Sequence, residues 1–226
     1  MSGPNPSGQV SGARPPYSKP ADGHRPYGAH RFDVYSIKAG RRLTLFGRGP
    51  LNLWIQLEAD PTVTHLCERP LVVPDCEPRR VVDFWAGSDN LDRLIFLIRG
   101  DDPMTAAKRQ IQLAAFRIWA ADAGCKIEER VTPEPSGYAF DNLIVMLQYC
   151  SSYRSSLSED CLERVGRLLV EPMPVDRLIE AAGCSAGSDD AEILRATVYD
   201  LVRRGRARIP ELVSTRLHDG LEVEPC

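Results

Sequence analysis

The sequence predicts an α/β protein, in which a mixed sheet flanked by helices is followed by a helical, winged-helix-like domain. Three observations predict this fold class. A helical run that begins at Pro50 is followed by short β-rich runs between residues 63 and 99. A longer helical pattern, 104–123, and one more β-rich run, 126–131, then complete a sheet with helices on its faces. Beyond the Pro-rich segment 132–135, the pattern is helical almost to the end.

Composition divides the chain into three parts. Residues 1–30 are rich in Pro, Gly and Ser, and such a segment buries too little apolar surface to offset the entropy lost on ordering. We therefore expect residues 1–30 to be a disordered basic arm. Residues 31–135 are expected to form the sheet domain. Residues 136–226 are expected to form a linker helix followed by the winged-helix-like domain.

Charge is unevenly distributed along the chain. Residues 1–48 carry eight Lys and Arg residues but only two acidic residues, which leaves 20 basic and 29 acidic residues in the remainder. A basic segment before an acidic body suits phosphate binding, because each neutralised phosphate releases counterions. The alternative is that this basic segment is a solvated linker.

Several classes of protein are disfavoured by the composition. No run of 18 apolar residues is present, and the N-terminus has no signal sequence, so we expect a cytoplasmic protein without a membrane span. The seven cysteines include no CxxC pair, which favours free thiols in a reducing compartment over a disulfide framework or a zinc site. The four histidines are too widely separated to predict a metal cluster.

The N-terminal half contains most of the expected strands. Residues 31–45 alternate around Ala39-Gly40 and fit a hairpin. A helix of about ten residues begins at Pro50 and ends before Asp60-Pro61, because a residue that precedes proline avoids the α region. The strands expected after it are 63–66, 71–73, 80–86 and 92–99, the last two forming an antiparallel hairpin.

The C-terminal half has a helical pattern with clear boundaries. Ser158 and Asp189 are suitable N-caps, and Gly183 and Gly205 are suitable C-terminal stops. The helices expected after the linker helix are 158–170, 175–182 and 189–204, followed by a short basic strand at 206–210. Helices followed by such a strand predict a winged helix, a relative of helix-turn-helix modules.

Asp83 is the strongest candidate for a chemical role. It lies in the run Val81–Trp85, where an ionised carboxylate is costly unless it is paired or metal-bound. A strand that ends in a cation, Arg99, follows about 15 residues later. This is the pattern of a restriction-endonuclease-like site, in which acidic groups hold Mg²⁺ and a cation assists the attacking water. The alternative is that Asp83 only ends a strand or caps a turn.

Three short motifs occur in an order that resembles a known family. Leu57–Val63 reads Leu-Glu-Ala-Asp-Pro-Thr-Val, Glu68–Pro70 follows the next strand, and Val82–Phe84 contains the candidate aspartate. Together they resemble the TnsA family, the endonuclease subunit of Tn-seven-like heteromeric transposases. The resemblance extends over roughly residues 35–217.

The resemblance implies a function and a set of site residues. It implies a restriction-endonuclease-like N-terminal domain and a winged-helix C-terminal domain, which act at transposon DNA ends during cut-and-paste transposition. Asp83 would then bind Mg²⁺, Arg99 would neutralise the scissile phosphate, and water would be the nucleophile. The partners implied are a TnsB-like DDE transposase and a TnsC-like AAA ATPase regulator.

Two departures from the family pattern leave an alternative open. The family has a glutamate near the start of the first helix, where Gly49–Asn52 contains no acid, and Glu-x-Lys or Gln-x-Lys where this chain has Leu97-Ile98-Arg99. Either Glu58 or Asp60 could compensate for the missing glutamate, and Asp101-Asp102 could supply a displaced metal ligand. The alternatives are that Glu58 faces along its helix, that Asp60 caps a turn, and that Asp101-Asp102 cap the next helix. The alternative is a non-cleaving DNA-binding and assembly subunit of the same complex. An unrelated helical DNA-binding regulator is a third hypothesis.

Two groups of arginines are candidates for DNA binding. The resemblance places Arg41 and Arg42 near the DNA path, although a pair of arginines at a turn is also a common exposed feature. Five further cations lie within 14 positions, a density that suits a phosphate backbone: Arg195, Arg203, Arg204, Arg206 and Arg208. The alternatives for this second group are protein docking, as in the family's contact with the regulator, and a purely structural role.

Overall fold

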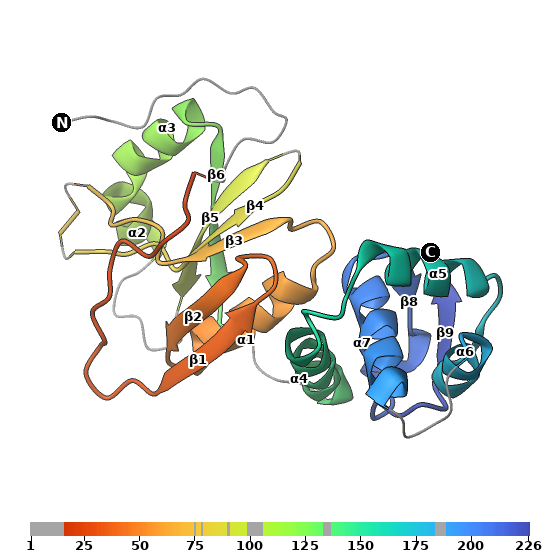
Figure 1. Ribbon diagram of the computed structural model, residues 1–226. Helices are drawn as coiled ribbons and strands as arrows, with labels where there is room; N and C mark the ends of the chain where they lie inside the picture. The colour runs from red at the N-terminus through yellow and green to blue at the C-terminus, as the bar shows by residue number, and fades with distance from the viewer. Residues whose placement is uncertain are drawn as a thin grey trace. The chain divides into compact units, whose positions relative to one another are not determined.

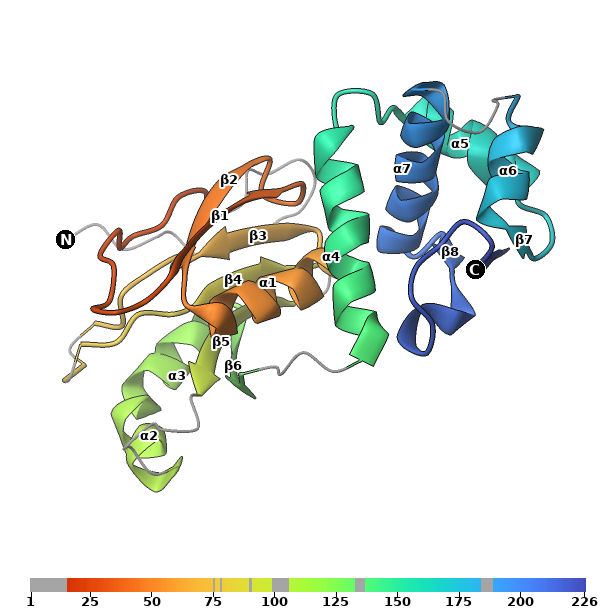
Figure 2. The ribbon, with the colours of Figure 1, turned by 90° about the horizontal axis from the view of Figure 1, so that it is seen from below.

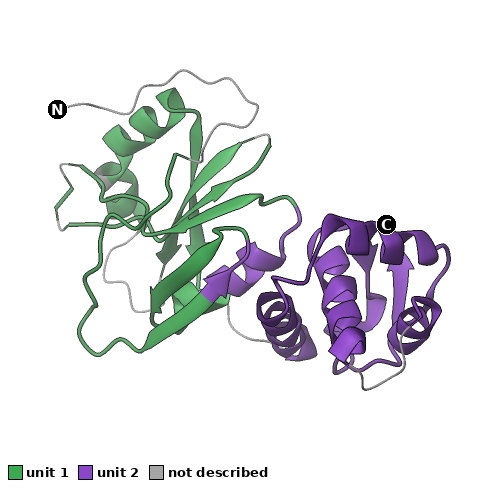
Figure 3. Cartoon of the chain, in the orientation of Figure 1, with its two compact units in different colours: residues 1–34, 38–53, 62–133 green, residues 35–37, 54–61, 134–226 purple. Residues whose placement is uncertain are grey.

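The computed structural model describes residues 16–74, 76–77, 79–89, 91–98, 106–132, 137–183 and 189–226. The chain forms two compact units, which are coloured separately in Figure 3. The sheet unit comprises residues 1–34, 38–53 and 62–133, and the helical unit comprises residues 35–37, 54–61 and 134–226. The predicted fold class is confirmed, because a mixed four-stranded sheet packed with helices precedes a mostly helical region with a small sheet.

The central sheet of the sheet unit has the strand order β3-β4-β5-β6 (Figure 1). Its strands are β3 (His65–Glu68), β4 (Phe84–Gly87), β5 (Asp92–Ile98) and β6 (Cys125–Val131). The first three strands are antiparallel, whereas β6 runs parallel to β5. A parallel neighbour requires a long crossover connection, and this connection contains two helices. They are α2 (Ala106–Gln112) and α3 (Ala114–Asp122), and α3 packs against β6.

The predicted β4–β5 hairpin and the predicted strand β6 are confirmed, but two predicted elements differ. The helix expected at 104–123 is divided into α2 and α3 at Leu113, whose backbone has φ −95° and ψ 3°. The Leu113 side chain is fully buried, so packing fixes this local deviation from helical geometry. The strand expected at 71–73 is reduced to an isolated bridge between Val72 and Val81.

A hairpin and a helix precede the sheet, as predicted. The strands β1 (Arg31–Ser36) and β2 (Arg41–Phe46) form a two-stranded sheet, and Gly40 has the positive φ (64°) that the turn between them requires. Helix α1 (Arg48–Ala59) contains Pro50 in its first turn and ends before Asp60-Pro61. Strand β1 and helix α1 each contribute residues to both units.

The core of the sheet unit includes part of the N-terminal arm. Trp85, Phe96 and Phe116 are buried together in this core, and the ring of Tyr17 packs on Trp85 with a centroid distance of 5.6 Å. The backbone N–H of Ala21 also donates to the carbonyl of a residue in the sheet unit, Arg69, at 2.8 Å. The prediction of disorder through residue 30 is therefore wrong for this part of the arm, because the Tyr17 ring buries apolar surface. Residues 1–15 lie outside the described residues.

The helical unit packs four helices around a separate apolar core (Figure 2). They are α4 (Gly137–Ser152), α5 (Glu159–Leu168), α6 (Val175–Ala181) and α7 (Asp189–Arg203). Ser158 is confirmed as an N-cap, since its hydroxyl accepts the N–H of Cys161 at 3.2 Å. Gly183 and Gly205 have the positive φ of C-terminal stops. Asp189 is the first described residue of α7.

The helical unit is not entirely helical. Three short antiparallel strands pair in the order β7-β9-β8. They are β7 (Met173–Pro174), β8 (Ala207–Arg208) and β9 (Glu222–Pro225). The strand expected at 206–210 is reduced to β8, because Pro210 begins the 3₁₀ helix η1 (Pro210–Val213). Throughout the described residues, every helix is too short or too polar to cross a membrane.

Candidate functional site

A pocket of about 470 Å³ lies beside Asp83 in the sheet unit, where β3 ends and β4 begins. Apolar walls are provided by residues such as Phe46, Pro50 and Phe84. The charged and titratable residues that line the pocket are Asp22, His24, Glu68, Arg69, Arg79 and Asp83. The pocket therefore combines the predicted site residue with several charged groups that were assigned no role from the sequence.

Asp83 lies immediately before β4. Its backbone N–H donates to the carbonyl of Ile95 at 2.9 Å, and its carbonyl accepts the N–H of Arg69 at 2.8 Å. Its carboxylate Oδ2 accepts the backbone N–H of Leu97 at 2.7 Å. The Asp83 side chain thus adds a hydrogen bond to β5 next to the residues through which β4 and β5 pair. This is a structural role of the kind that the alternative interpretation assigns to Asp83.

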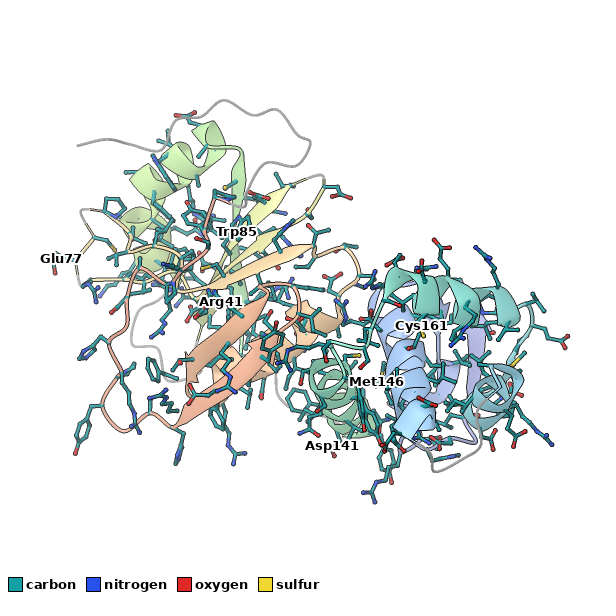
Figure 4. The ribbon with its side chains drawn as sticks, in the orientation of Figure 1. Arg41, Glu77, Trp85, Asp141, Met146 and Cys161 are labelled. Carbon is teal, nitrogen blue, oxygen red and sulfur yellow. The ribbon has the colours of Figure 1, made fainter. Side chains whose placement is uncertain are left out.

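Glu68 is the most deeply buried carboxylate of the pocket, with an exposed fraction of 2%. Arg41 binds it with both terminal nitrogens, Nη1 to Oε1 at 2.9 Å and Nη2 to Oε2 at 2.5 Å. Burial lowers the pKa of Arg41, but the hydrogen bonds and charge of Glu68 outweigh it, so this pKa lies above its usual value. Figure 4 labels Arg41 within the sheet unit. The candidate DNA-binding side chain Arg41 is therefore engaged inside its own domain.

Arg69 has an unusual backbone conformation. Its φ is +45°, and the other positive φ values among the described residues all belong to glycines. The left-handed region costs other residues roughly 1–2 kcal/mol, and a residue before proline favours an extended backbone instead. Hydrogen bonds from Arg69 N–H to Asp83 and from Ala21 N–H to the Arg69 carbonyl, both at 2.8 Å, hold this conformation. Tertiary contacts thus override the local preference of the sequence Arg69-Pro70.

The Arg69 guanidinium contacts backbone oxygens and an aromatic ring. It donates to the carbonyl of Thr44 at 3.3 Å and to that of His24 at 3.5 Å. Its Cζ lies 4.5 Å from the centroid of the Phe46 ring. Burial lowers the pKa of Arg69, although nearby acidic charges oppose this effect. Within the described residues it forms no ion pair with a carboxylate.

Asp22 and Arg79 form another ion pair at the pocket, with a distance of 2.9 Å. The Asp22 carboxylate also accepts the backbone N–H of His24 at 2.7 Å. Burial raises the pKa of Asp22, but this N–H and Arg79 together lower it below its usual value. Asp22 therefore stays ionised and neutralises Arg79.

The described residues do not supply a complete magnesium site. Mg²⁺ prefers oxygen ligands, and Asp22, Glu68 and Asp83 all line the pocket. However, Asp22 and Glu68 are each engaged by an arginine, which a metal ion would have to displace. No group of three potential metal ligands lies together in the part of the chain that the structure describes.

Two of the residues that could compensate for the missing glutamate, Glu58 and Asp60, are described by the structure. Glu58 belongs to the helical unit and is 1% exposed. It accepts hydrogen bonds from Ser36 Oγ at 2.6 Å and from Ile37 N–H at 2.9 Å. Asp60 also belongs to the helical unit, just beyond the end of α1. Arg99, Asp101 and Asp102 lie outside the described residues.

The five candidate DNA-binding arginines of the helical unit are all bound to carboxylates. Two of them bind Asp200, which is 1% exposed: Arg203 at 2.6 Å and Arg204 at 2.8 Å. The other ion pairs are Arg195 with Glu192 and Asp219, Arg204 and Arg206 with Glu159, and Arg208 with Glu224. These cations are therefore largely neutralised within the unit. Arg42, on β2, has an exposed side chain.

Sequence reasoning missed the chemical importance of Glu68 and Arg69. Both residues were noted as part of a motif, but without a role. The available signal was a pair of opposite charges directly after the apolar residues Leu66-Cys67, where burial of Glu68 predicts a cationic partner. The identity of that partner, Arg41, cannot be read from the sequence.

No protein-family model matches the chain, and a search of curated proteins finds no significant match in sequence.

Proposed function

We propose that this chain is a TnsA-like subunit of a heteromeric transposase of the Tn-seven-like kind, which acts at transposon DNA ends. The observation that carries the proposal is the position of Asp83 immediately before β4, hydrogen-bonded to Arg69 and to Ile95 and Leu97 of β5, and lining a charged pocket. The order of elements, from α1 through β3, β4 and β5 to the crossover helices and β6, supports the same proposal. The proposed partners are transposon-end DNA, a DDE transposase and an AAA ATPase regulator.

The geometry favours the form of this proposal in which the subunit assembles the complex and does not cut DNA. Glu68 is bound to Arg41. Strand β5 has the apolar residue Leu97 at the position where the TnsA-family pattern, Glu-x-Lys or Gln-x-Lys, has a polar residue. In the cleaving form, Mg²⁺ would be held at Asp83 and water would attack the phosphodiester. The two forms make opposite predictions for strand cleavage.

A nicking assay on supercoiled plasmid carrying transposon ends separates the two forms. The wild-type chain, Asp83→Asn and Asp83→Ala are each mixed with the partner transposase and either Mg²⁺ or Mn²⁺. The asparagine variant is included because its amide oxygen can still accept the Leu97 N–H. The control is Arg167→Gln, which removes an exposed arginine of the helical unit.

The non-cleaving form predicts no nick from this subunit, together with transposition that depends on its presence. Nicking that Asp83→Asn abolishes would instead establish the endonuclease. If the chain neither cleaves nor affects transposition with its partners, the transposase proposal is wrong in both forms.

A further inference from the structure

Among the arginines that line the Asp83 pocket, Arg69 differs from Arg79 in having no acidic partner in the described residues. Arg79 is bound to Asp22 at 2.9 Å, and Glu68 is bound by Arg41. Two of the three carboxylates at the pocket are thus already neutralised. Arg69 contributes a positive charge to this pocket that no ion pair within the described part of the chain cancels.

The hydrogen bonds of Arg69 leave room for a further acceptor. A guanidinium has five N–H donors in a planar fork that matches the oxygens of a phosphate. The described contacts of this fork are with the carbonyls of Thr44 and His24, at 3.3 and 3.5 Å. Both distances are long for a hydrogen bond, so these contacts orient the fork but are weak.

The Arg69 side chain is also held in place before any ligand arrives. The Phe46 ring supports the guanidinium at 4.5 Å, and two backbone hydrogen bonds of 2.8 Å fix the residue at φ +45°. Strained backbone that surrounding structure maintains is characteristic of binding and catalytic sites. A guanidinium oriented in advance loses little side-chain entropy on binding.

We infer that Arg69 binds a phosphate group of the DNA backbone in the Asp83 pocket. The inference rests on the proposed function, which supplies DNA as the substrate class. It assigns the phosphate contact to Arg69, which follows β3, whereas the resemblance to the TnsA family implies this role for Arg99. By binding this phosphate, Arg69 would fix the position of the DNA strand relative to Asp83.

Binding of a fluorescently labelled transposon-end duplex, measured by anisotropy over a series of salt concentrations, tests this inference on the full chain. Arg69→Gly and Arg69→Asn remove the charge, and both residues tolerate a positive φ. Arg69→Lys keeps the charge. Arg167→Gln is the matched control, since it removes an arginine that is 79% exposed and paired with Glu163.

We expect the glycine and asparagine variants to bind the duplex about tenfold more weakly than the wild type, as for the loss of one charge-assisted contact. The slope of log affinity against log salt should fall by about one, because one phosphate contact is lost. Arg69→Lys should keep the wild-type slope, and Arg167→Gln should match the wild type in affinity and slope. Inorganic phosphate should compete with the duplex for the wild type more strongly than chloride at equal ionic strength.

The outcomes distinguish this inference from the function on which it rests. If the wild type binds the duplex and Arg69→Gly binds it with the same affinity and slope, Arg69 makes no phosphate contact, and the proposed function stands. If Arg69→Lys loses as much slope as Arg69→Gly, charge is not the cause and the inference is overturned. If the wild type fails to bind the duplex even with the partner transposase, both proposals fall.

Discussion

The carboxylate of Asp83 accepts the backbone N–H of Leu97 at 2.7 Å, so a side chain completes the hydrogen bonding of two neighbouring strands. This contact gives Asp83 a role in stability, whether or not the residue also takes part in DNA cleavage. An activity lost on substitution of Asp83 could therefore reflect an altered sheet. Tests of this residue need a stability measurement beside the activity measurement.

The two substitutions of Asp83 should differ in stability. Asp83→Ala leaves the Leu97 N–H without its acceptor, and we expect the free energy of unfolding to fall by about 1–3 kcal/mol. Asp83→Asn retains an oxygen acceptor for this N–H, so its free energy of unfolding should fall by less. Urea unfolding followed by circular dichroism measures both. Equal stability of the alanine variant and the wild type would show that the contact contributes nothing.

The buried ion pair of Arg41 and Glu68 predicts strong coupling between the two residues. Arg41→Met would leave the Glu68 carboxylate, 3% exposed in its side chain, without its cation. Removing one partner of a buried pair costs about 3–5 kcal/mol, so a large loss of stability is expected. In Arg41→Met/Glu68→Gln, which also removes the charge of Glu68, much of this loss should be recovered. Additive effects in the double-mutant cycle would contradict the prediction.

The arginines of α7 and β8 should differ in their importance for folding. The Arg203 side chain is 8% exposed and bonds to buried Asp200, whereas the Arg208 side chain is 67% exposed. We expect Arg203→Met to lower the free energy of unfolding by about 1–3 kcal/mol, because a hydrogen bond to a buried charge is lost. Arg208→Gln, the control, should change it by less than about 0.5 kcal/mol. Similar effects of the two substitutions in thermal unfolding would show that burial does not separate them.

Three thiols with raised pKa values predict a loss of stability at alkaline pH. Burial raises the pKa of Cys67 and of Cys125 from 9.0 to about 11, and that of Cys150 to about 12. Because the folded state binds these protons more tightly than the unfolded state, the stabilisation is complete below pH 9 and is lost as the pH rises through 11 to 12. Urea unfolding under reducing conditions at a series of pH values should show this decline. Cys67→Ala should make the decline shallower, and an identical pH profile for this variant would exclude Cys67 as a contributor.

The sequence predicted the parts of the fold that depend on local pattern. The helix that ends before Asp60-Pro61 and the turn at Gly40 follow from backbone preferences of proline and glycine. The β4–β5 hairpin follows from two apolar runs around a polar turn. The division between α2 and α3 did not follow, because it depends on how buried Leu113 packs.

The site was predictable only in part, for a similar reason. Asp83 is recognisable because a carboxylate stands among residues that favour burial. Arg41 bonds to Glu68 across 27 positions, and a pair of arginines after a turn gives no sign of such a partner. The conformation of Arg69 opposes both of its local preferences, so it depends on tertiary contacts that no local pattern records.

Helix α1 is part of both units, with its residues up to Leu53 in the sheet unit and those from Trp54 in the helical unit. Ile37, from the N-terminal third of the chain, likewise packs against the core of the helical unit. A gene cut after residue 133 would therefore separate residues 134–226 from the two earlier segments of the helical unit, 35–37 and 54–61, whereas the sheet unit would keep all of its residues. Transfer of residues 134–226 into another protein as a continuous cassette would carry an incomplete helical unit, so this part of the chain is expected to be inherited together with the part that precedes it.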